Sequence, residues 1–527
     1  MVPERHREKS GYPENAVSGE LTTKGNDSMS KKPLYEPETG IHRAKGWEIA
    51  FYALNNSSTN LYMFIFMYIT YYLTGIAGVG VALAGTIMTV MRIWDGITDP
   101  IVGFIVDKTN GKFGKNRPFI VIGQIFMLIG TSLIFFVGPK LPMGARFIFF
   151  ILCYMFYIIG YTSQCVVTKS AQTCLTNDPK QRPVFSVFDS IYNVIIFAVF
   201  PIIVTTVILP QHDVLDAAGN VIQSGFTTAS FHQALWALGA GISAILAVLA
   251  IIGLWRKDRQ EFFGTGEVVR LHFRDYVDVV KHNRPIQMLC LAACSDKLFI
   301  TMQQNAVVLI MLFGIIIGDY STYASFTGIS SVLTIVVSVL LIMVVARNMG
   351  QKKAMLLGTY GGMAGAVVVF LLLLLGDPTH VSYKSINLYT IVFTASFIIM
   401  KGFGSLSSTL VIPMTADCAD YEVYRSGKYA PGLMGTLFSF IDKVTSSLGT
   451  TLIGFMLAAI GFKTAQPTPI TPYSSGIFWV TMTCLIFGPM IGWILNLVAM
   501  KYYDLDKEKM ASIQEDIAKI KAGIKNN

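Results

Sequence analysis

Runs of about twenty apolar residues recur along the chain, separated by short polar stretches. A run of this length crosses the hydrocarbon core of a bilayer as an α-helix, because a helix satisfies its own backbone hydrogen bonds. A transmembrane barrel would instead show alternating segments of roughly ten residues. The pattern therefore predicts about twelve transmembrane helices. They are expected at 48–76, 80–106, 118–138, 146–169, 184–209, 231–255, 286–316, 322–346, 352–376, 385–412, 432–461 and 475–502.

A polar stretch divides the predicted helices into two sets. The expected parts are a disordered cytoplasmic tail (1–46), a six-helix bundle (47–255), a cytoplasmic linker (256–285), a second six-helix bundle (286–502) and an amphipathic cytoplasmic tail (503–527). Two six-helix bundles form the layout of the major facilitator fold, an all-α membrane architecture with its substrate site between the halves. Met29 is an alternative to Met1 as the translation start.

The charge distribution fits this topology. Only 14% of the residues are charged, against roughly 25% in soluble proteins. The net charge of +9 comes from lysines and arginines in short loops, so we expect a lipid bilayer rather than nucleic acid as the partner. The loop 210–230 contains Asp213 and Asp216 and no lysine or arginine, which predicts a cell (inner) membrane protein with both termini cytoplasmic.

The second predicted helix carries two carboxylates that a membrane segment rarely contains. Asp95 and Asp99 are spaced i, i+4, so they lie one turn apart on one face. Carboxylates this close repel unless a cation lies between them or one is protonated, and Thr98 adds a hydroxyl oxygen. The spacing indicates a site for Na⁺ or H⁺. The alternative is a pair neutralised by Arg92 or by a lysine from another helix.

Further charged residues interrupt the other apolar runs, and each is costly unless it faces a cavity or a partner. They include Lys169, Asp189, Asp296, Lys297, Asp442 and Lys443. The two lysines deep in separate helices, Lys297 and Lys443, either pair with carboxylates between the halves or hold an anionic substrate. No phosphate-binding loop, hydrolase motif or metal-binding histidine cluster accompanies them. We therefore expect no enzyme, no catalytic residue, no cofactor and no metal beyond a sodium ion at Asp95 and Asp99.

Three features together resemble the glycoside–pentoside–hexuronide:cation symporter family. They are the stretch 92–100 with the sequence RIWDGITDP and the loop 111–118 with GKFGKNRP, the stretch 416–428 with ADCADYEVYRSGK, and Lys443. The similarity extends by helix order from about residue 46 to residue 503. The stretch 416–428 is expected in a loop before the eleventh helix. The two loop motifs imply gating residues, which are Asp107, Lys115, Arg117, Asp417, Asp420 and Arg425.

The resemblance also implies a cation site formed by Asp95, Thr98, Asp99 and Thr162. Thr98 replaces an asparagine of the family, which exchanges one oxygen ligand for another. The eleventh-helix lysine of the family matches Lys443.

The implied substrate site departs from the galactoside pattern. Thr59 and Cys165 stand where the family has sugar-binding acids, and Lys169 stands where it has an aromatic residue. Its arginine matches Ser190, or Asp189 with a shift of one residue. We expect the substrate-binding residues Thr59, Arg92, Cys165, Lys169, Asp189, Asp296, Lys297 and Lys443.

These features predict a monomeric secondary transporter that couples Na⁺ or H⁺ to uptake of a sugar or glycoside, including an acidic one such as a hexuronide. An ion-independent exchanger or efflux carrier of a non-sugar solute on the same fold is the alternative. A membrane-embedded sensor or enzyme would need an appended domain or a catalytic motif, and the sequence has neither.

Overall fold

The computed structural model describes residues 35–36, 41–109, 111–176, 178, 181–259, 262, 281–341, 344–345, 347–426, 431–506, 508–513 and 515–516. The first half contains α1 (Gly46–Phe66), α2 (Ile69–Gly75), α3 (Val81–Lys108), α4 (Arg117–Ser132), α5 (Met143–Ser170), α6 (Gln172–Leu175), α7 (Arg182–Ile203), α8 (Leu209–His212) and α9 (Ala229–Leu254). The second half contains α11 (Arg284–Gln303), α12 (Ala306–Ile310), α13 (Ser321–Leu341), α14 (Arg347–Met349), α15 (Gln351–Leu375), α16 (Leu388–Ser426), α17 (Pro431–Ala459), α18 (Ser475–Met482) and α19 (Gly488–Tyr502).

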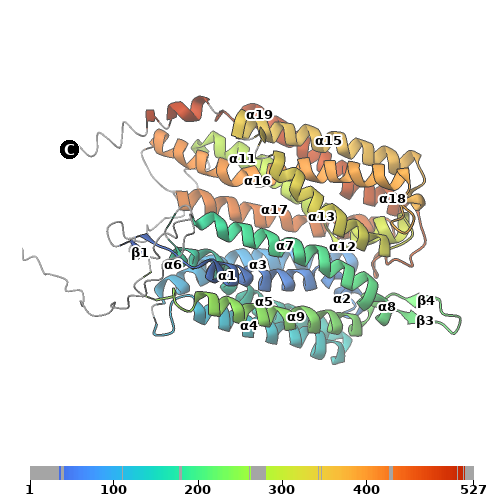
Figure 1. Ribbon diagram of the computed structural model, residues 1–527. Coiled ribbons are helices and arrows are strands. Elements are labelled where there is room, and N and C mark those ends of the chain that lie inside the picture. The colour runs from blue at the N-terminus through green and yellow to red at the C-terminus, as the bar shows by residue number, and fades with distance from the viewer. Residues whose placement is uncertain are drawn as a thin grey trace, which may run out of the picture.

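Two short antiparallel hairpins mark the ends of the helices. β1 (Tyr35–Glu36) pairs with β2 (Ile41–His42), and β3 (Val214–Leu215) pairs with β4 (Val221–Gln223). In Figure 1, β3 and β4 project beyond one end of the long helices, and β1 lies at the other. We call the first the hairpin end and the second the terminal end.

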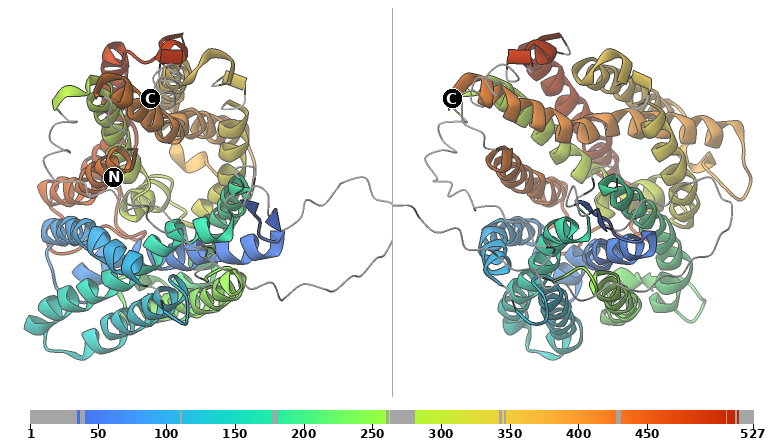
Figure 2. Two further views of the ribbon diagram at one scale, coloured as in Figure 1. Left: turned by 90° about the vertical axis from the view of Figure 1, so that its left-hand side faces the viewer. Right: turned by 60° about the vertical axis from the view of Figure 1, so that its left-hand side comes forward.

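The helices form two groups that face each other. Figure 1 shows α1–α9 in the lower half and α11–α19 in the upper half, and the turned views of Figure 2 keep the two groups apart. Within the groups, α1 packs on α9, α4 on α5, α11 on α19 and α15 on α16. Between the groups, α3 packs on α17 and α7 on α13.

Eight helices within the described residues are long and apolar enough to cross a membrane. These spans are Arg117–Lys140, Met143–Ser170, Val184–His212, Ala229–Leu254, Arg284–Gln303, Gln351–Leu375, Leu388–Val411 and Ser475–Tyr502. α13 contributes a shorter apolar stretch, Ser321–Val337. α1, α3 and α17 carry more polar and charged residues, and all three line the cavity described below.

α16 is longer than the sequence predicts. The apolar run ends near residue 412, but the helix continues to Ser426. Asp417, Asp420 and Arg425 therefore lie on a helix, and the expectation of a loop was wrong. Charged residues end a membrane span without ending a helix, because the backbone hydrogen bonds continue in water. Met414 and Cys418, one turn apart, are buried and hold the extension against the bundle.

The two predicted tails are only partly described. Residues 41–45 were assigned to a disordered tail, but the Arg43 side chain pairs with Asp178, and the Ala44 backbone N–H donates to Gln181 Oε1 at 2.9 Å. These buried contacts order the segment beside α6 and α7. Most of the tail over 1–46, most of the linker over 256–285 and residues 517–527 lie outside the described residues.

Candidate functional site: a cavity between the halves

A cavity of about 960 Å³ lies between the two halves. Residues of α1, α3, α5 and α7 line it on one side, and residues of α11, α13, α16 and α17 line it on the other. These helices include both pairs that join the halves, α3 with α17 and α7 with α13. A molecule in the cavity therefore contacts both halves at once.

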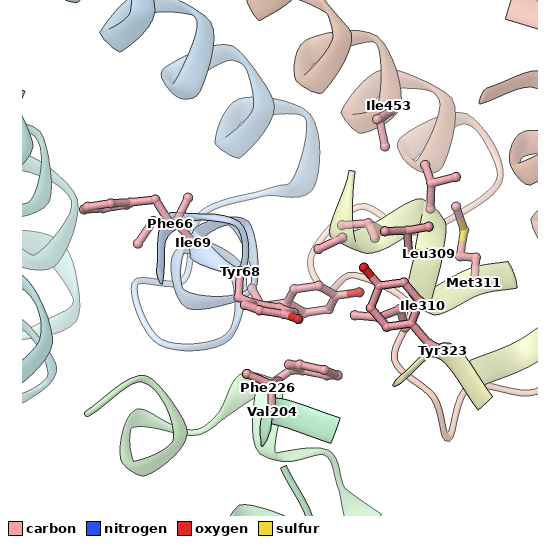
Figure 3. Packing of buried hydrophobic residues seen from close by; sticks show 14 of the residues in the cluster. Phe66, Tyr68, Ile69, Val204, Phe226, Leu309, Ile310, Met311, Tyr323 and Ile453 are labelled. Carbon is pink, nitrogen blue, oxygen red and sulfur yellow. The ribbon is translucent and has the colours of Figure 1, made fainter. Parts of the chain in front are cut away.

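The hairpin end of the cavity is closed by contacts between the halves. Tyr71 Oη donates to Pro467 O at 2.6 Å, and Thr70 Oγ1 donates to Gln466 Oε1 at 3.2 Å. The Tyr320 ring meets Phe226 edge-on, with 5.7 Å between centroids. Figure 3 shows aromatic and aliphatic side chains of both halves, including Tyr68, Phe226, Leu309 and Tyr323, gathered at this closure.

The hydrophobic core is continuous at one end of the molecule and divided at the other. One buried cluster joins both halves at the hairpin end, with Tyr68 and Phe226 from the first half and Leu309 and Tyr323 from the second. Two separate clusters fill the terminal ends of the halves, one around Tyr52 and one around Leu406. Among the described residues, the halves are therefore bonded more extensively at the hairpin end, as in a transporter that is closed on one side.

The carboxylate pair of α3 forms the polar centre of the site. Asp95 is 1% exposed, and its Oδ1 accepts a hydrogen bond of 3.0 Å from Thr162 Oγ1 on α5. The hydroxyls of Thr98 and Thr162 are 3.1 Å apart. The predicted cation ligands Asp95, Thr98 and Thr162 are thus in direct contact, and Asp99 lies one turn further along α3. Oxygen ligands of this kind suit a hard cation.

Two positive side chains neutralise these carboxylates. Lys443 Nζ on α17 lies 3.2 Å from Asp95 Oδ2 and also donates to Asp99 Oδ2. Arg92 lies 3.3 Å from Asp95 Oδ2 through one guanidinium nitrogen. In this conformation the Lys443 ammonium bridges the two acids, which is the ion-pair alternative that the sequence left open. A coupling cation at the pair would compete with that ammonium.

The close approach of α3 and α17 brings Lys443 within reach. A Cβ on Gly85 would lie 2.6 Å from Thr450 O, and a Cβ on Gly454 would lie 2.9 Å from Val81 O. Both contacts are too short for a side chain, so these two glycines permit the helix contact. The ion bridge and the helix packing therefore depend on each other.

The two walls of the cavity differ in chemistry. The first half presents three tyrosines of α5, Tyr154, Tyr157 and Tyr161, at helical spacing. The second half presents hydroxyls, amides and lysines at its wall: Lys297, Thr301, Gln304, Asn305, Thr327, Ser330, Ser331, Thr334, Lys401, Ser405, Thr409, Ser446, Ser447 and Thr450. Aromatic faces with a few directed polar groups are typical of small-molecule sites.

Lys401 is a cavity residue that the sequence reasoning missed. It lies in α16 and lines the cavity with Ser405 and Thr409, at i, i+4 and i+8. Its Nζ lies 5.1 Å from the centroid of the Phe397 ring. The signal was present in the sequence, because Lys401 is the one charged residue in the apolar run 385–412.

The predicted substrate residues separate into two groups. Arg92 and Lys297 line the cavity, and Lys443 reaches it through Asp95. Asp189 accepts a hydrogen bond of 2.7 Å from Asn56 Nδ2, beside the lining residue Ser190.

The other predicted residues lie away from the cavity lining. Thr59 is 1% exposed and donates to Asn56 O on its own helix at 2.7 Å. Asp296 is 3% exposed and accepts a hydrogen bond of 3.0 Å from Asn496 Nδ2, on the side of α11 that packs on α19. Cys165 and Lys169 lie further along α5, beyond Tyr161, and Lys169 is exposed.

The first gating motif folds around a carboxylate from another segment. Asp258, 0% exposed, accepts backbone N–H bonds from Lys115 at 3.1 Å and from Arg117 at 2.9 Å. Asp107 lies in the last turn of α3. The N-terminus of α4 favours this negative charge through its unpaired N–H groups. The motif 111–118 thus connects α3, α4 and the end of α9.

The second gating motif lies on the extension of α16. Glu422, 3% exposed, accepts a bond of 2.7 Å from Arg425 and one of 2.9 Å from Asn283 Nδ2. Burial and the nearby Asp420 raise the pKa of the Asp417 carboxyl to about 6. This motif therefore connects α16 to the start of α11.

The chain matches the family described as MFS/sugar transport protein over residues 52–507. It is 24% identical over 488 residues to the isoprimeverose transporter of Lactiplantibacillus pentosus, covering 91% of this chain and 93% of the relative. It is 23% identical over 448 residues to a glucuronide carrier protein homolog of Escherichia coli, covering 83% of this chain and 90% of the relative. The crystal structure of the nucleoside transporter NupG is similar at 13% identity and a TM-score of 0.55, covering 88% of this chain and 99% of that one.

The fold and the two-sided cavity define a multi-pass membrane transporter of the major facilitator type, not an enzyme. The chain belongs to the MFS/sugar transport protein family, and its resemblance to the glycoside–pentoside–hexuronide:cation symporters is confirmed.

Proposed function

We propose that this protein is a cation-coupled symporter of a sugar or glycoside, with Na⁺ or H⁺ as the coupling ion at Asp95, Thr98, Asp99 and Thr162. The observation that carries the proposal is the cluster of oxygen ligands at the cavity, where Asp95 accepts a hydrogen bond from Thr162 and the hydroxyls of Thr98 and Thr162 are 3.1 Å apart. A coupling ion that displaces the Lys443 ammonium frees it for a solute in the cavity. Each ligand then promotes binding of the other, which linkage makes reciprocal.

The substrate class is inferred from the cavity and the relatives. The tyrosine wall of α5 suits the apolar face of a sugar ring, and the facing hydroxyl and amide groups suit its hydroxyls. The relatives named as isoprimeverose transporter and glucuronide carrier homolog support a glycoside-like solute, neutral or acidic. The basic loops support cytoplasmic termini, so the cavity would face the cytoplasm in this conformation.

An ion-independent exchanger is the second candidate, and the Lys443 bridge itself favours it. If the ammonium neutralises both acids throughout the cycle, then Asp95 and Asp99 are structural and no external cation is required.

Uptake into proteoliposomes distinguishes the two candidates. Labelled isoprimeverose and methyl β-D-glucuronide would be offered under an inward Na⁺ gradient, an inward H⁺ gradient or neither. The symporter accumulates a solute only with one ion gradient, and Asp95→Asn and Asp99→Asn abolish that accumulation, whereas the control Asp504→Asn, at an exposed site outside the cavity, does not. Exchange at the same rate in all three conditions would contradict ion coupling.

A further inference from the structure

Lys401 differs from the other cations at the cavity in its surroundings. The charged groups that line the cavity or lie beside its lining are the cations Arg92, Lys297, Lys401 and Lys443 and the carboxylates Asp95, Asp99, Asp189 and Asp442. Arg92 and Lys443 contact Asp95, and Asp442 lies within electrostatic range of Lys297. Among the described residues, the recorded contact of the Lys401 ammonium is the Phe397 ring of its own helix.

Lys401 is the cation of this set for which the described residues show no carboxylate contact. An ammonium in the middle of a membrane span is costly unless an anion or water accompanies it, and such residues mark ligand pathways. A ring of the same helix compensates only part of this cost. The Lys401 ammonium is therefore placed to meet a negative group that enters the cavity.

The surroundings of Lys401 are arranged for a ligand. Ser405 and Thr409 continue the same face of α16 toward the terminal end, and all three residues line the cavity. α11 packs against α16 and adds Lys297 and Thr301 to the same wall. The hydroxyls of Ser405 and Thr409 donate to carbonyls of their own helix, at 2.8 Å to Gly402 O and 2.9 Å to Ser405 O. A carboxylate that enters the cavity would accept hydrogen bonds from the ammonium groups, and from these hydroxyls once they rotate away from the carbonyls.

We propose that Lys401 binds a negatively charged group of the transported solute, which makes the physiological substrate a sugar acid or an acidic glycoside. The inference rests on the proposed function and deepens it, because it assigns the charge preference to one residue of the second half. The sugar ring would face the tyrosines of α5, with its anionic group against α16. A neutral sugar would leave the Lys401 ammonium desolvated and unpaired.

The test compares matched ligand pairs that differ in one charged group. Isothermal titration calorimetry in constant NaCl measures the binding of methyl β-D-glucuronide against methyl β-D-glucoside, and of galacturonate against galactose. One of the two pairs is expected to bind more tightly to the unmodified protein. Within that pair, the dissociation constant of the acidic sugar should be at least tenfold lower than that of the neutral sugar. Lys401→Met should weaken the acidic member about 10- to 100-fold, as expected for a charge-assisted hydrogen bond, and spare the neutral one.

Control variants separate the charge effect from general damage. Lys401→Arg should retain the acid preference, and Lys401→Gln serves as a second neutral variant, with melting temperatures checking that each folds. Lys501→Met removes a lysine from the exposed last turn of α19, outside the cavity, and should leave the preference unchanged.

The outcomes distinguish this inference from the proposed function. A preference for the neutral member, or an acid preference that persists in Lys401→Met and Lys401→Gln, would overturn the role of Lys401 while sugar transport stands. Failure of every sugar to bind would overturn the sugar transporter itself, and this inference with it.

Discussion

At the scale of single residues, Lys443 decides how the carboxylate pair behaves. Two acids one turn apart, one of them almost fully buried, repel each other unless positive charge lies between them or one is protonated. The ammonium of Lys443 supplies it from the opposite half, so the chemistry of the site depends on how the halves are arranged. A tethered cation and a free one then compete for the same oxygens.

The first prediction concerns that competition. Lys443→Met should destabilise the protein by about 3 kcal/mol in choline chloride at pH 8, because a buried carboxylate loses its partner. Sodium should restore much of the melting temperature by binding between the acids. Differential scanning fluorimetry in NaCl and in choline chloride measures both effects. Equal sodium responses in the variant and the unmodified protein would show that the Lys443 ammonium and sodium do not compete for this pair.

A second residue-scale prediction concerns pH. The pKa of Asp417 is raised to about 6 by burial and by Asp420, so the folded protein binds more protons than the unfolded chain between about pH 4 and 6. Stability is therefore lost as pH rises through this interval. Asp417→Asn should raise the melting temperature at pH 7.5, and the gain should shrink toward pH 4. A gain that is constant across this range would exclude the carboxyl as its cause.

At the scale of elements, helix ends and short turns connect segments far apart in the chain. The turn 111–117 surrounds Asp258, which follows α9, and the extension of α16 reaches Asn283 through Glu422. Gly114 has φ +92°, and a Cβ there would lie 2.1 Å from Asp258 Oδ2. The motif 111–118 needs its second glycine for both reasons.

The prediction at this scale uses two glycines of the same turn. Gly114→Ala should cost at least about 1–2 kcal/mol from the left-handed backbone alone, and displacement of Asp258 adds to that. Gly111→Ala is the matched control, because the nearest atom to its Cβ would be 4.0 Å away. Melting temperatures of both variants test the difference, and an equal change in the two would contradict the Asp258 contact.

At the scale of the whole molecule, the two halves are bonded most extensively at the hairpin end, as far as the described residues extend. The hydrogen bond from Tyr71 to Pro467 and the aromatic contact between Phe226 and Tyr320 cross the interface there. Alternating access requires these contacts to break when the cavity opens on that side. The strength of these contacts therefore sets the balance between the conformation closed at the hairpin end and the conformation open there.

The prediction at this scale shifts that balance. Tyr71→Phe removes one buried hydrogen bond between the halves, worth about 1 kcal/mol, and should raise the population open at the hairpin end several-fold. Distances between spin labels on the loops at Asn220 and Thr379, one from each half, would report it. Tyr389→Phe, which loses a bond within the second half only, is the control. No change in the distance distribution would mean that this bond does not hold the closure.

The sequence by itself determined the helices, because apolar length and loop charge depend only on local composition. It also identified the carboxylate pair, because i, i+4 spacing places both residues on one face of a helix. The resemblance to the symporter family also identified Lys443. Only the tertiary structure decided which charges meet: Asp296 contacts α19, Thr59 bonds within α1, and Lys401 faces the cavity. These outcomes depend on the rotation of each helix against its neighbours, and helix rotation is set by packing between distant segments such as α3 and α17.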